Sequence, residues 1–352
     1  MQSFGKDKSL KLKGIAIMLM IFHHCFRTTN YFSGYPVSFF PFSESQIVNL
    51  ASASKICVSI FAFISGYGLY LSYGVKSGSA QKWAITRYVK SFAGYWFIWF
   101  CSAVMCQLID GRTYKTLFKE GFYQGFLYSI ISFFGLDSIF KTPALNAIWW
   151  YMGAVIVFLL LTPLVYKCKN EMLLLLAAFI VLPREFLGVS GVVKASGTKA
   201  FSFLIPFLMG SIFARYRLFD KLAESNSIQA RVYRLICEVW MMIFLYKMYH
   251  HVDRGLYWEV HYAALPMVFI LFLVEFILPI RVMQKPLLFL GKHSMNMYLV
   301  HAFLLSYLKQ TIFNNRHFMA STLILLAMSL AVSIIVETLK KLIRYNSLFT
   351  SF

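Results

Sequence analysis

A lysine and a histidine near the start of the chain, Lys13 and His24, are separated by eleven residues. In a helix eleven residues make about three turns, so the two side chains share one face and lie about 16 Å apart along the axis. The adjacent His23 points about 100° away from His24. A neutral imidazole acts as a general base near pH 7, so His24 is a candidate catalytic residue. A hydrogen bond between helices explains the same histidine equally well.

Two other short stretches offer groups that hydrogen-bond. Ser65-Gly66-Tyr67 provides two hydroxyls beside a glycine that allows close helix packing. Tyr298 and His301 are three residues apart and share a helix face. Taken singly, each stretch is explained by helix packing alone.

Two further pairs have a simple topological explanation. Arg87 and Lys90 precede an apolar run, where basic residues anchor the cytoplasmic end of a span. Trp149 and Trp150 begin another apolar run and fit an outer aromatic belt.

The composition of the chain indicates an integral membrane protein. Of the 352 residues 59% are hydrophobic and 14% are charged, whereas a soluble domain has about a quarter charged residues. This excludes a water-soluble globular enzyme, a disordered protein and a nucleic-acid-binding module. The net charge of +20 comes mostly from residues between apolar runs, as the positive-inside rule predicts. Such a face attracts lipid headgroups or a phosphorylated cofactor.

The apolar runs predict an all-α, polytopic membrane protein that forms a single domain over residues 1–352. A spanning helix needs about 20 mostly apolar residues. Ten stretches meet this requirement: 12–30, 50–74, 91–109, 146–166, 171–189, 200–216, 232–250, 260–280, 293–311 and 319–337.

An eleventh apolar stretch, 121–136, is short, contains glycines and is rich in Tyr and Phe. Counting it as a span would place the cluster of basic residues from Arg215 to Arg234 outside, against the positive-inside rule. We therefore interpret 121–136 as a re-entrant or interfacial element on the outer side. Both termini are then cytoplasmic.

No metal site is predicted. The six cysteines have no recurrent spacing, and most fall within or beside apolar segments. His250, His251 and His261 do not form a recognised ligand pattern with Asp253 or Glu259.

Four stretches in this order resemble the membrane acyltransferase family three, whose members acylate hydroxyls, mostly with acetyl-CoA as the donor. The matching stretches are Lys13-Gly14-Ile15-Ala16 with His24, Ser65-Gly66-Tyr67, Trp150 to Pro163, and Gly291 to His301. With the ten-span layout they cover most of the chain.

The resemblance implies that His24 is the catalytic histidine. It also implies that the basic residue eleven positions earlier belongs to the same motif; that residue is typically Arg and is Lys13 in this chain, which keeps the charge and loses the bidentate fork. Arg87 matches a family arginine that follows the Ser-Gly-Tyr element, and Tyr298 and His301 match the family's Tyr-Leu-Val-His pattern.

One departure from the family concerns acid–base groups. Many members that modify polysaccharides have a glutamate pair five and six residues after the motif tryptophan. Val155 and Ile156 occupy these positions. A second carboxylate must then come from elsewhere, with Glu259, Glu275 and Glu337 as candidates, or the mechanism depends on His24 alone.

The sequence therefore predicts an acyl-CoA-dependent O-acyltransferase, most simply an O-acetyltransferase, in a bacterial cell membrane. It would transfer the acyl group across the membrane, with His24 as a general base in direct transfer or as a nucleophile that takes the acyl group first. The acceptor is a hydroxyl of a cell-envelope glycan or its lipid-linked precursor. The expected roles are donor binding by Lys13, Arg87 and Lys90, hydrogen bonds to the oxyanion or acceptor from Ser65, Tyr67, Tyr298 and His301, and an acceptor side at Trp149 and Trp150.

Two other classes of function fit the same sequence. A transporter for a small polar solute would use Lys13, His24 and His301 to line a passage. It would show solute flux without consuming acyl-CoA. A non-catalytic membrane scaffold is the third class, and the ionisable residues within the spans argue against it.

Overall fold

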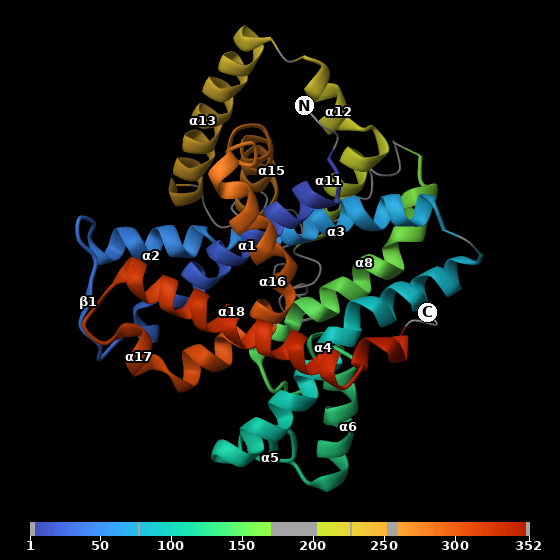
Figure 1. The fold of residues 1–352 in the computed structure, drawn as a ribbon, viewed down its shortest axis with the longest axis vertical. Helices are drawn as coiled ribbons and strands as arrows, with labels where there is room; N and C mark the ends of the chain where they lie inside the picture. Colours follow the sequence, from blue (N-terminus) through green and yellow to red (C-terminus); the bar gives the residue numbers. More distant parts are fainter. Residues whose placement is uncertain (1–3, 77, 170–202, 226, 252–259, 350–352) are drawn as a thin grey trace.

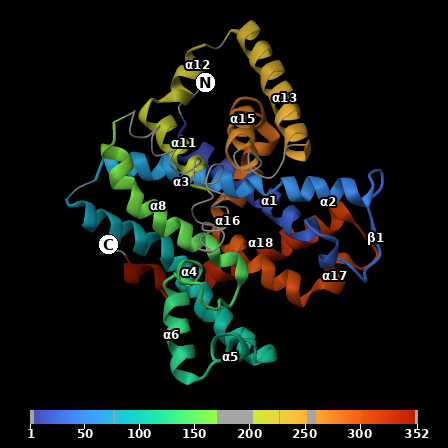
Figure 2. The ribbon, with the colours of Figure 1, turned by 180° about the vertical axis from the view of Figure 1, so that it is seen from behind.

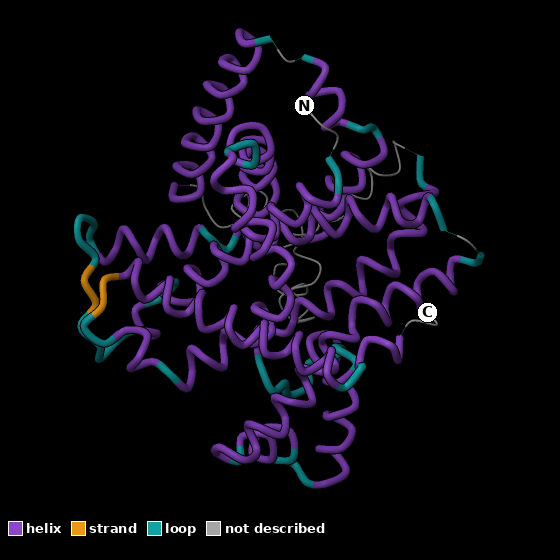
Figure 3. The backbone as a smooth tube through the Cα atoms, viewed as in Figure 1, coloured by secondary structure: helices purple, strands orange, loops and turns teal. Residues whose placement is uncertain are grey.

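The computed structural model describes the chain except for residues 1–3, 77, 170–202, 226, 252–259 and 350–352. The described residues are almost entirely helical (Figures 1 and 3), which confirms the all-α prediction. In this part of the chain the sheet is one short parallel pairing of β1 (Val37–Ser38) with β2 (Arg316–His317).

The first half of the chain forms long helices joined by shorter elements. The long helices are α1 (Lys6–Phe26), α3 (Ile56–Gly74), α4 (Ala80–Asp110) and α8 (Trp150–Lys167). The shorter elements are η1 (Thr29–Tyr31), α2 (Glu44–Ala53), α5 (Arg112–Leu117), α6 (Phe122–Phe133), α7 (Asp137–Phe140) and η2 (Ala147–Trp149).

The second half has the same character, with two π-helical turns. Its helices are α11 (Leu204–Arg215), α12 (Leu218–Glu224), α13 (Ile228–His251), α15 (Leu265–Phe272), α16 (Arg281–Tyr307), α17 (Lys309–Phe313) and α18 (Phe318–Leu342). The π turns are η4 (Val260–Ala264) and η5 (Leu273–Ile277), and a final 3-10 turn is η6 (Tyr345–Phe349).

Five helical stretches in the described part of the chain are long and apolar enough to cross a membrane. They are Lys6–Phe26, Glu44–Gly74, Ala80–Asp110, Ala147–Lys167 and Phe318–Leu342. These match five of the predicted spans, while the predicted span 171–189 lies outside the described residues. The total of ten spans and the cytoplasmic position of both termini stay predictions.

Two helix crossings at the centre of the molecule depend on glycines. A Cβ atom added to Gly14 would lie 2.3 Å from the Leu287 carbonyl oxygen, and one added to Gly291 would lie 1.8 Å from that of Leu10. Helices α1 and α16 therefore touch backbone to backbone. Helices α3 and α11 do the same through Gly66 and Gly210. Gly68 has nothing within 4 Å of an added Cβ, so it plays no part in this close packing.

The C-terminal ends of three helices are tied together by one arginine. Arg215, at the end of α11, donates hydrogen bonds of 2.8–3.2 Å to the backbone carbonyls of Val165, Tyr166 and Cys168 at the end of α8. It also donates to the Tyr70 hydroxyl near the end of α3 at 3.0 Å. These three ends lie on one side of the molecule, as the predicted topology requires.

The stretch 121–136 contains a helix too short to span a membrane. Helix α6 has 12 residues, or about 18 Å, against the roughly 30 Å of a bilayer core. Its end packs on α4, because Ser132 accepts hydrogen bonds from Tyr95 and Trp99 and the Phe134 carbonyl accepts one from Tyr88. Figures 1 and 2 show α5 and α6 projecting from one end of the molecule beside α4.

Candidate functional site

The adjacent histidines of α1 face different neighbours. His23 Nδ1 lies 2.7 Å from the backbone oxygen of Ala51 on α2. The His24 ring lies 5.0 Å from the His23 ring on one side and 5.0 Å from the His301 ring of α16 on the other. The angle of about 100° between successive residues of a helix thus directs the two rings to different neighbours. His23 bonds to the backbone of α2, and His24 packs against α16.

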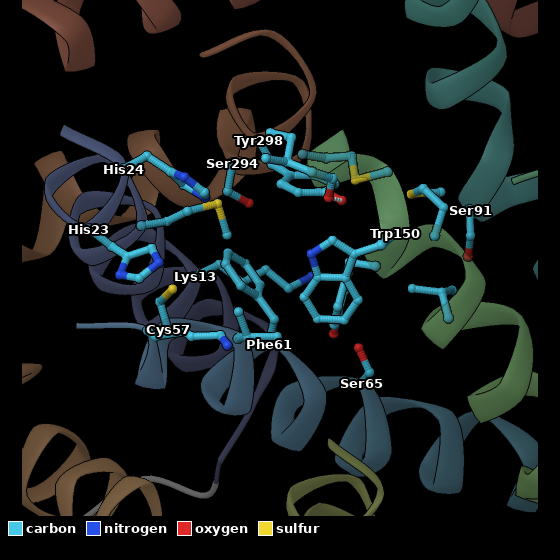
Figure 4. Close-up of a pocket in the computed structure, with 18 of the residues that line it drawn as sticks. Lys13, His23, His24, Cys57, Phe61, Ser65, Ser91, Trp150, Ser294 and Tyr298 are labelled. Carbon is cyan, nitrogen blue, oxygen red and sulfur yellow. Dashed lines mark hydrogen bonds between the residues drawn. The ribbon is translucent and has the colours of Figure 1, made fainter. Parts of the chain in front are cut away.

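His24 lines a cavity of about 400 Å³, which we call the His24 cavity. Its walls come from α1, α3, α4, α8 and α16 (Figure 4). In that view the two histidines lie at one end and Ser91 of α4 lies at the other, with Phe61 and Trp150 between them. The Lys13 side chain extends from α1 into the same space. A single hollow therefore joins the lysine and the histidine of the first motif.

The structure brings six of the predicted site residues into the wall of this cavity. They are Lys13, His24, Ser65, Lys90, Trp150 and Tyr298. They come from five helices and are up to 285 positions apart in the chain, so only the tertiary fold brings them together.

Two of the predicted residues lie away from the cavity wall. Tyr67 packs its ring against Phe4 and Phe219, at centroid distances of 4.7 and 6.0 Å. Trp149 is fully buried, and its indole N–H donates to the Leu299 backbone oxygen at 3.0 Å. Both side chains have packing roles in this structure.

Two other predicted residues, His301 and Arg87, do not line the cavity. His301 is fully buried, its Nδ1 lies 3.1 Å from the Met297 backbone oxygen, and its ring contacts that of His24. Arg87 lies one turn before Ser91 on the same face of α4. His301 therefore packs against His24 without lining the cavity, and the period of the helix places Arg87 on the face of α4 that carries Ser91.

Two of the hydroxyl groups predicted to hydrogen-bond a substrate, those of Tyr298 and Ser65, lie in the cavity wall. The Tyr298 hydroxyl donates to the Ile148 backbone oxygen at 2.5 Å, so its proton is already used within the protein. Tyr298 thereby holds the turn η2 against α16. Ser65 presents its hydroxyl to the cavity from α3 (Figure 4).

The described wall of the cavity contains six basic side chains and no carboxylate. They are Lys13, His23, His24, Arg27, Lys55 and Lys90. Val155, at one of the two positions where many family-three members have glutamate, also lines the cavity. Cations that line a concave, poorly hydrated space attract and orient anions. The cavity is therefore suited to a negatively charged ligand or to charge that develops during a reaction.

Two of these cations escaped the analysis of the sequence. Arg27 lies three residues after His24, its guanidinium donates to the Tyr31 hydroxyl, and its Nε has no hydrogen-bond partner among the described residues. Lys55 sits between α2 and α3, with its ammonium 5.0 Å from the Tyr262 ring centroid. Lys55 could have been found from the sequence, because it lies inside the predicted span 50–74. A charged residue within a span indicates a functional site by default.

The glutamates considered as replacements for the missing pair are engaged elsewhere. Glu275 forms a bidentate ion pair with Arg234 of α13 at 2.6–3.0 Å. Glu337 accepts from Asn296 at 2.7 Å and pairs with Lys340 at 2.5 Å. Neither lines the His24 cavity. Glu259 lies outside the described residues.

Metal binding has no support in the described part of the chain. No group of three or more His, Cys, Asp or Glu side chains is placed to hold an ion there. The side chains of His250, His251 and His261 are outside the described set.

Comparison with known proteins gives one result. A family model described as an acyltransferase domain, that of acyltransferase family 3, matches residues 11–338, which is most of the chain. No curated protein and no solved structure matches. The match runs from the turn before Lys13 to the last helix and so includes every wall of the His24 cavity.

Proposed function

Because the chain belongs to acyltransferase family 3, we propose that it transfers an acyl group from an acyl-CoA, acetyl in the simplest case, to a hydroxyl of a cell-envelope glycan or its lipid-linked precursor. The observation that carries the proposal is the His24 cavity itself. One space contains basic side chains suited to a phosphorylated donor and a histidine suited to proton transfer.

The donor would enter from the side where α4 begins. Lys90 and Lys13 line the cavity, and Arg87 lies one turn further out on α4. These three cations would hold the phosphates of CoA, and the pantetheine arm would extend along α1. The helical rise of about 16 Å between Lys13 and His24 separates the charged part of such a donor from its thioester.

The chemical step uses His24 as a general base in direct transfer. His24 removes the proton of the acceptor hydroxyl while the hydroxyl oxygen attacks the thioester carbonyl carbon. The new C–O bond forms, and the carbonyl electrons move to the oxygen. When this intermediate collapses the C–S bond breaks, and the CoA thiolate leaves and takes the proton from His24. The products are an ester and free CoA.

The oxyanion of that intermediate needs positive charge or hydrogen-bond donors. Arg27 and Lys55 line the cavity with His24 and carry positive charge, and Ser65 offers a hydroxyl. Fixed cations at the point where negative charge develops stabilise a transition state more than they stabilise the neutral thioester. We assign this role to Arg27 and Lys55 in place of Tyr67 and Tyr298.

The test measures release of CoA from acetyl-CoA by the purified protein in liposomes, with methyl glycosides as model acceptors. We expect the His24→Ala variant to lose about 10²- to 10⁴-fold in rate while retaining donor binding. His293→Ala is the matched control, because His293 also lies on a central helix but contacts Ser333 of α18 outside the cavity. Full activity of His24→Ala, or a wild-type protein that neither binds nor consumes acyl-CoA, would contradict the proposal.

A further inference from the structure

A second hollow, of about 320 Å³, lies on the other side of the turn that begins α8. Its described wall includes Asp137, Ser138, Lys141, Thr142 and Trp150. We call it the Asp137 hollow. The loop that forms it contains none of the sequence motifs described above.

The loop folds back on Asp137 through its own hydrogen bonds. The Ser138 backbone N–H donates to Asp137 Oδ1 at 2.8 Å, and the Thr142 backbone N–H donates to the Asp137 carbonyl at 3.1 Å. The Ser138 hydroxyl donates to the Trp150 carbonyl at 3.2 Å and so joins the loop to α8. Gly153 leaves room for that hydroxyl, because an added Cβ would lie 2.3 Å from it. The hollow is therefore a formed feature of the fold.

Three polar atoms of this loop are buried without a hydrogen-bond partner among the described residues. They are Asp137 Oδ2, Thr142 Oγ1 and Asn146 Nδ2. The Asp137 side chain is only 2% exposed. A buried polar group without a partner is costly, and native proteins retain such groups mainly where a ligand or water completes them. The first two belong to residues that line the hollow.

Trp150 connects the two spaces, because it lines both the Asp137 hollow and the His24 cavity. Two consecutive residues of η2 also face different spaces: Ala147 lines the hollow and Ile148 lines the cavity. A ligand in the hollow therefore lies next to the space that holds His24. The described wall of the hollow combines a carboxylate, two hydroxyl groups and an exposed lysine, which suits a small molecule with several hydroxyl groups.

We propose that the Asp137 hollow binds one sugar ring of the acceptor, with Asp137 and Thr142 hydrogen-bonded to its hydroxyls. The statement that this sugar ring belongs to the acceptor rests on the proposed function. The statement that the hollow binds a sugar ring is independent of it. An ionised carboxylate accepts hydrogen bonds from two hydroxyls at once, which neutral side chains do less well. Lys141, exposed at the rim, adds a cation for a substituent outside the ring.

The experiment measures binding of a panel of methyl glycosides by saturation-transfer NMR, using the full chain in lipid nanodiscs without sugar detergents. The panel contains the methyl glycosides of glucose, galactose, mannose and N-acetylglucosamine. We expect at least one to bind to the wild type. Asp137→Ala should weaken its affinity by about tenfold or more, and Thr142→Val by a smaller factor.

Two further variants separate sugar binding from folding and from catalysis. Asp137→Asn keeps the size and one acceptor oxygen, so it should bind more tightly than Asp137→Ala. Glu120→Gln, in an exposed carboxylate that accepts from Tyr128, is the matched control and should leave binding unchanged. His24→Ala should also keep sugar binding, so failure of the acyltransfer proposal and failure of this one are distinguishable.

Two results would overturn the proposal. One is wild-type affinity in both Asp137→Ala and Thr142→Val. The other is a wild-type protein that binds none of the four glycosides.

Discussion

The His24 cavity and the Asp137 hollow share one tryptophan and differ in charge and in construction. The cavity lies among long helices, and its described wall has basic side chains and no carboxylate. The hollow is formed largely by the loop between α7 and α8, and its most buried charged group is a carboxylate. One space is suited to an anion and the other to hydroxyl donors.

Under the two proposals made above, this difference would keep the donor and the acceptor apart until they react. A thioester donor brings phosphates, and a sugar brings neutral hydroxyls. Opposite charges in adjacent spaces discriminate between the two by electrostatics before any detailed fit is needed. The long helices provide rigidity for the chemistry, while the loop can vary in sequence to suit an acceptor.

The largest expected effect concerns the close crossing of α1 and α16, two of the helices that form the wall of the His24 cavity. Gly291→Ala places a Cβ against the Leu10 backbone oxygen, which cannot move without displacing α1. We expect a loss of about 3 kcal/mol or more in stability, seen as a lower thermal midpoint in nanodiscs. Gly68→Ala is the control, because nothing lies within 4 Å of its added Cβ. Equal midpoints for the two variants would mean that the α1–α16 crossing is not tight.

The next effect concerns how the stability of the folded chain depends on pH through Asp137 of the hollow. Burial raises the pKa of Asp137 to about 6. Between about pH 4 and pH 6 the folded chain therefore holds a proton that the unfolded chain releases, so stability falls as the pH rises through this window. Above it the ionised carboxylate costs about 3 kcal/mol.

Asp137→Asn removes this cost. The variant should melt at a higher temperature than the wild type at pH 8 and at nearly the same temperature at pH 4. A difference that is independent of pH would show that Asp137 is not buried as a carboxyl group.

A smaller effect tests the charge of the cavity. Lys13→Met removes a cation from the cavity wall, so the affinity for acetyl-CoA should fall by about tenfold. Lys13→Arg should restore it, since arginine also carries the charge and can bind phosphate with two nitrogens. Lys11→Met is the matched control, because Lys11 bonds to Gln284 outside the cavity. Glycoside binding in the hollow should be the same in all three variants.

The smallest effect separates two neighbours in one sequence motif. Ser65→Ala should lower the rate of transfer by several-fold, because Ser65 lines the cavity. Tyr67→Phe should change the rate by less than about twofold, because Tyr67 packs against Phe4 and Phe219. Assays of both variants at saturating acetyl-CoA decide the matter, and a larger loss in Tyr67→Phe would reverse the assignment.

The sequence by itself determined the class of protein and the relative placement of the first two motif residues. Apolar composition requires a membrane protein, and the period of a helix places Lys13 and His24 on one face, whatever surrounds them. Motif order also identified the family that the comparison then showed. These properties are local or additive along the chain, so they can be read without knowing which helices are neighbours.

Only the tertiary structure decided which of the motif residues share a space. It placed Arg27 and Lys55 in the cavity wall and Tyr67 outside it, and it set Asp137 beside Trp150. Such neighbours depend on contacts like that of Tyr298 with Ile148, 150 positions away in the chain. The period of a helix determines which of its residues share a face. Which other helix packs against that face depends on close contacts between segments that are far apart in the sequence.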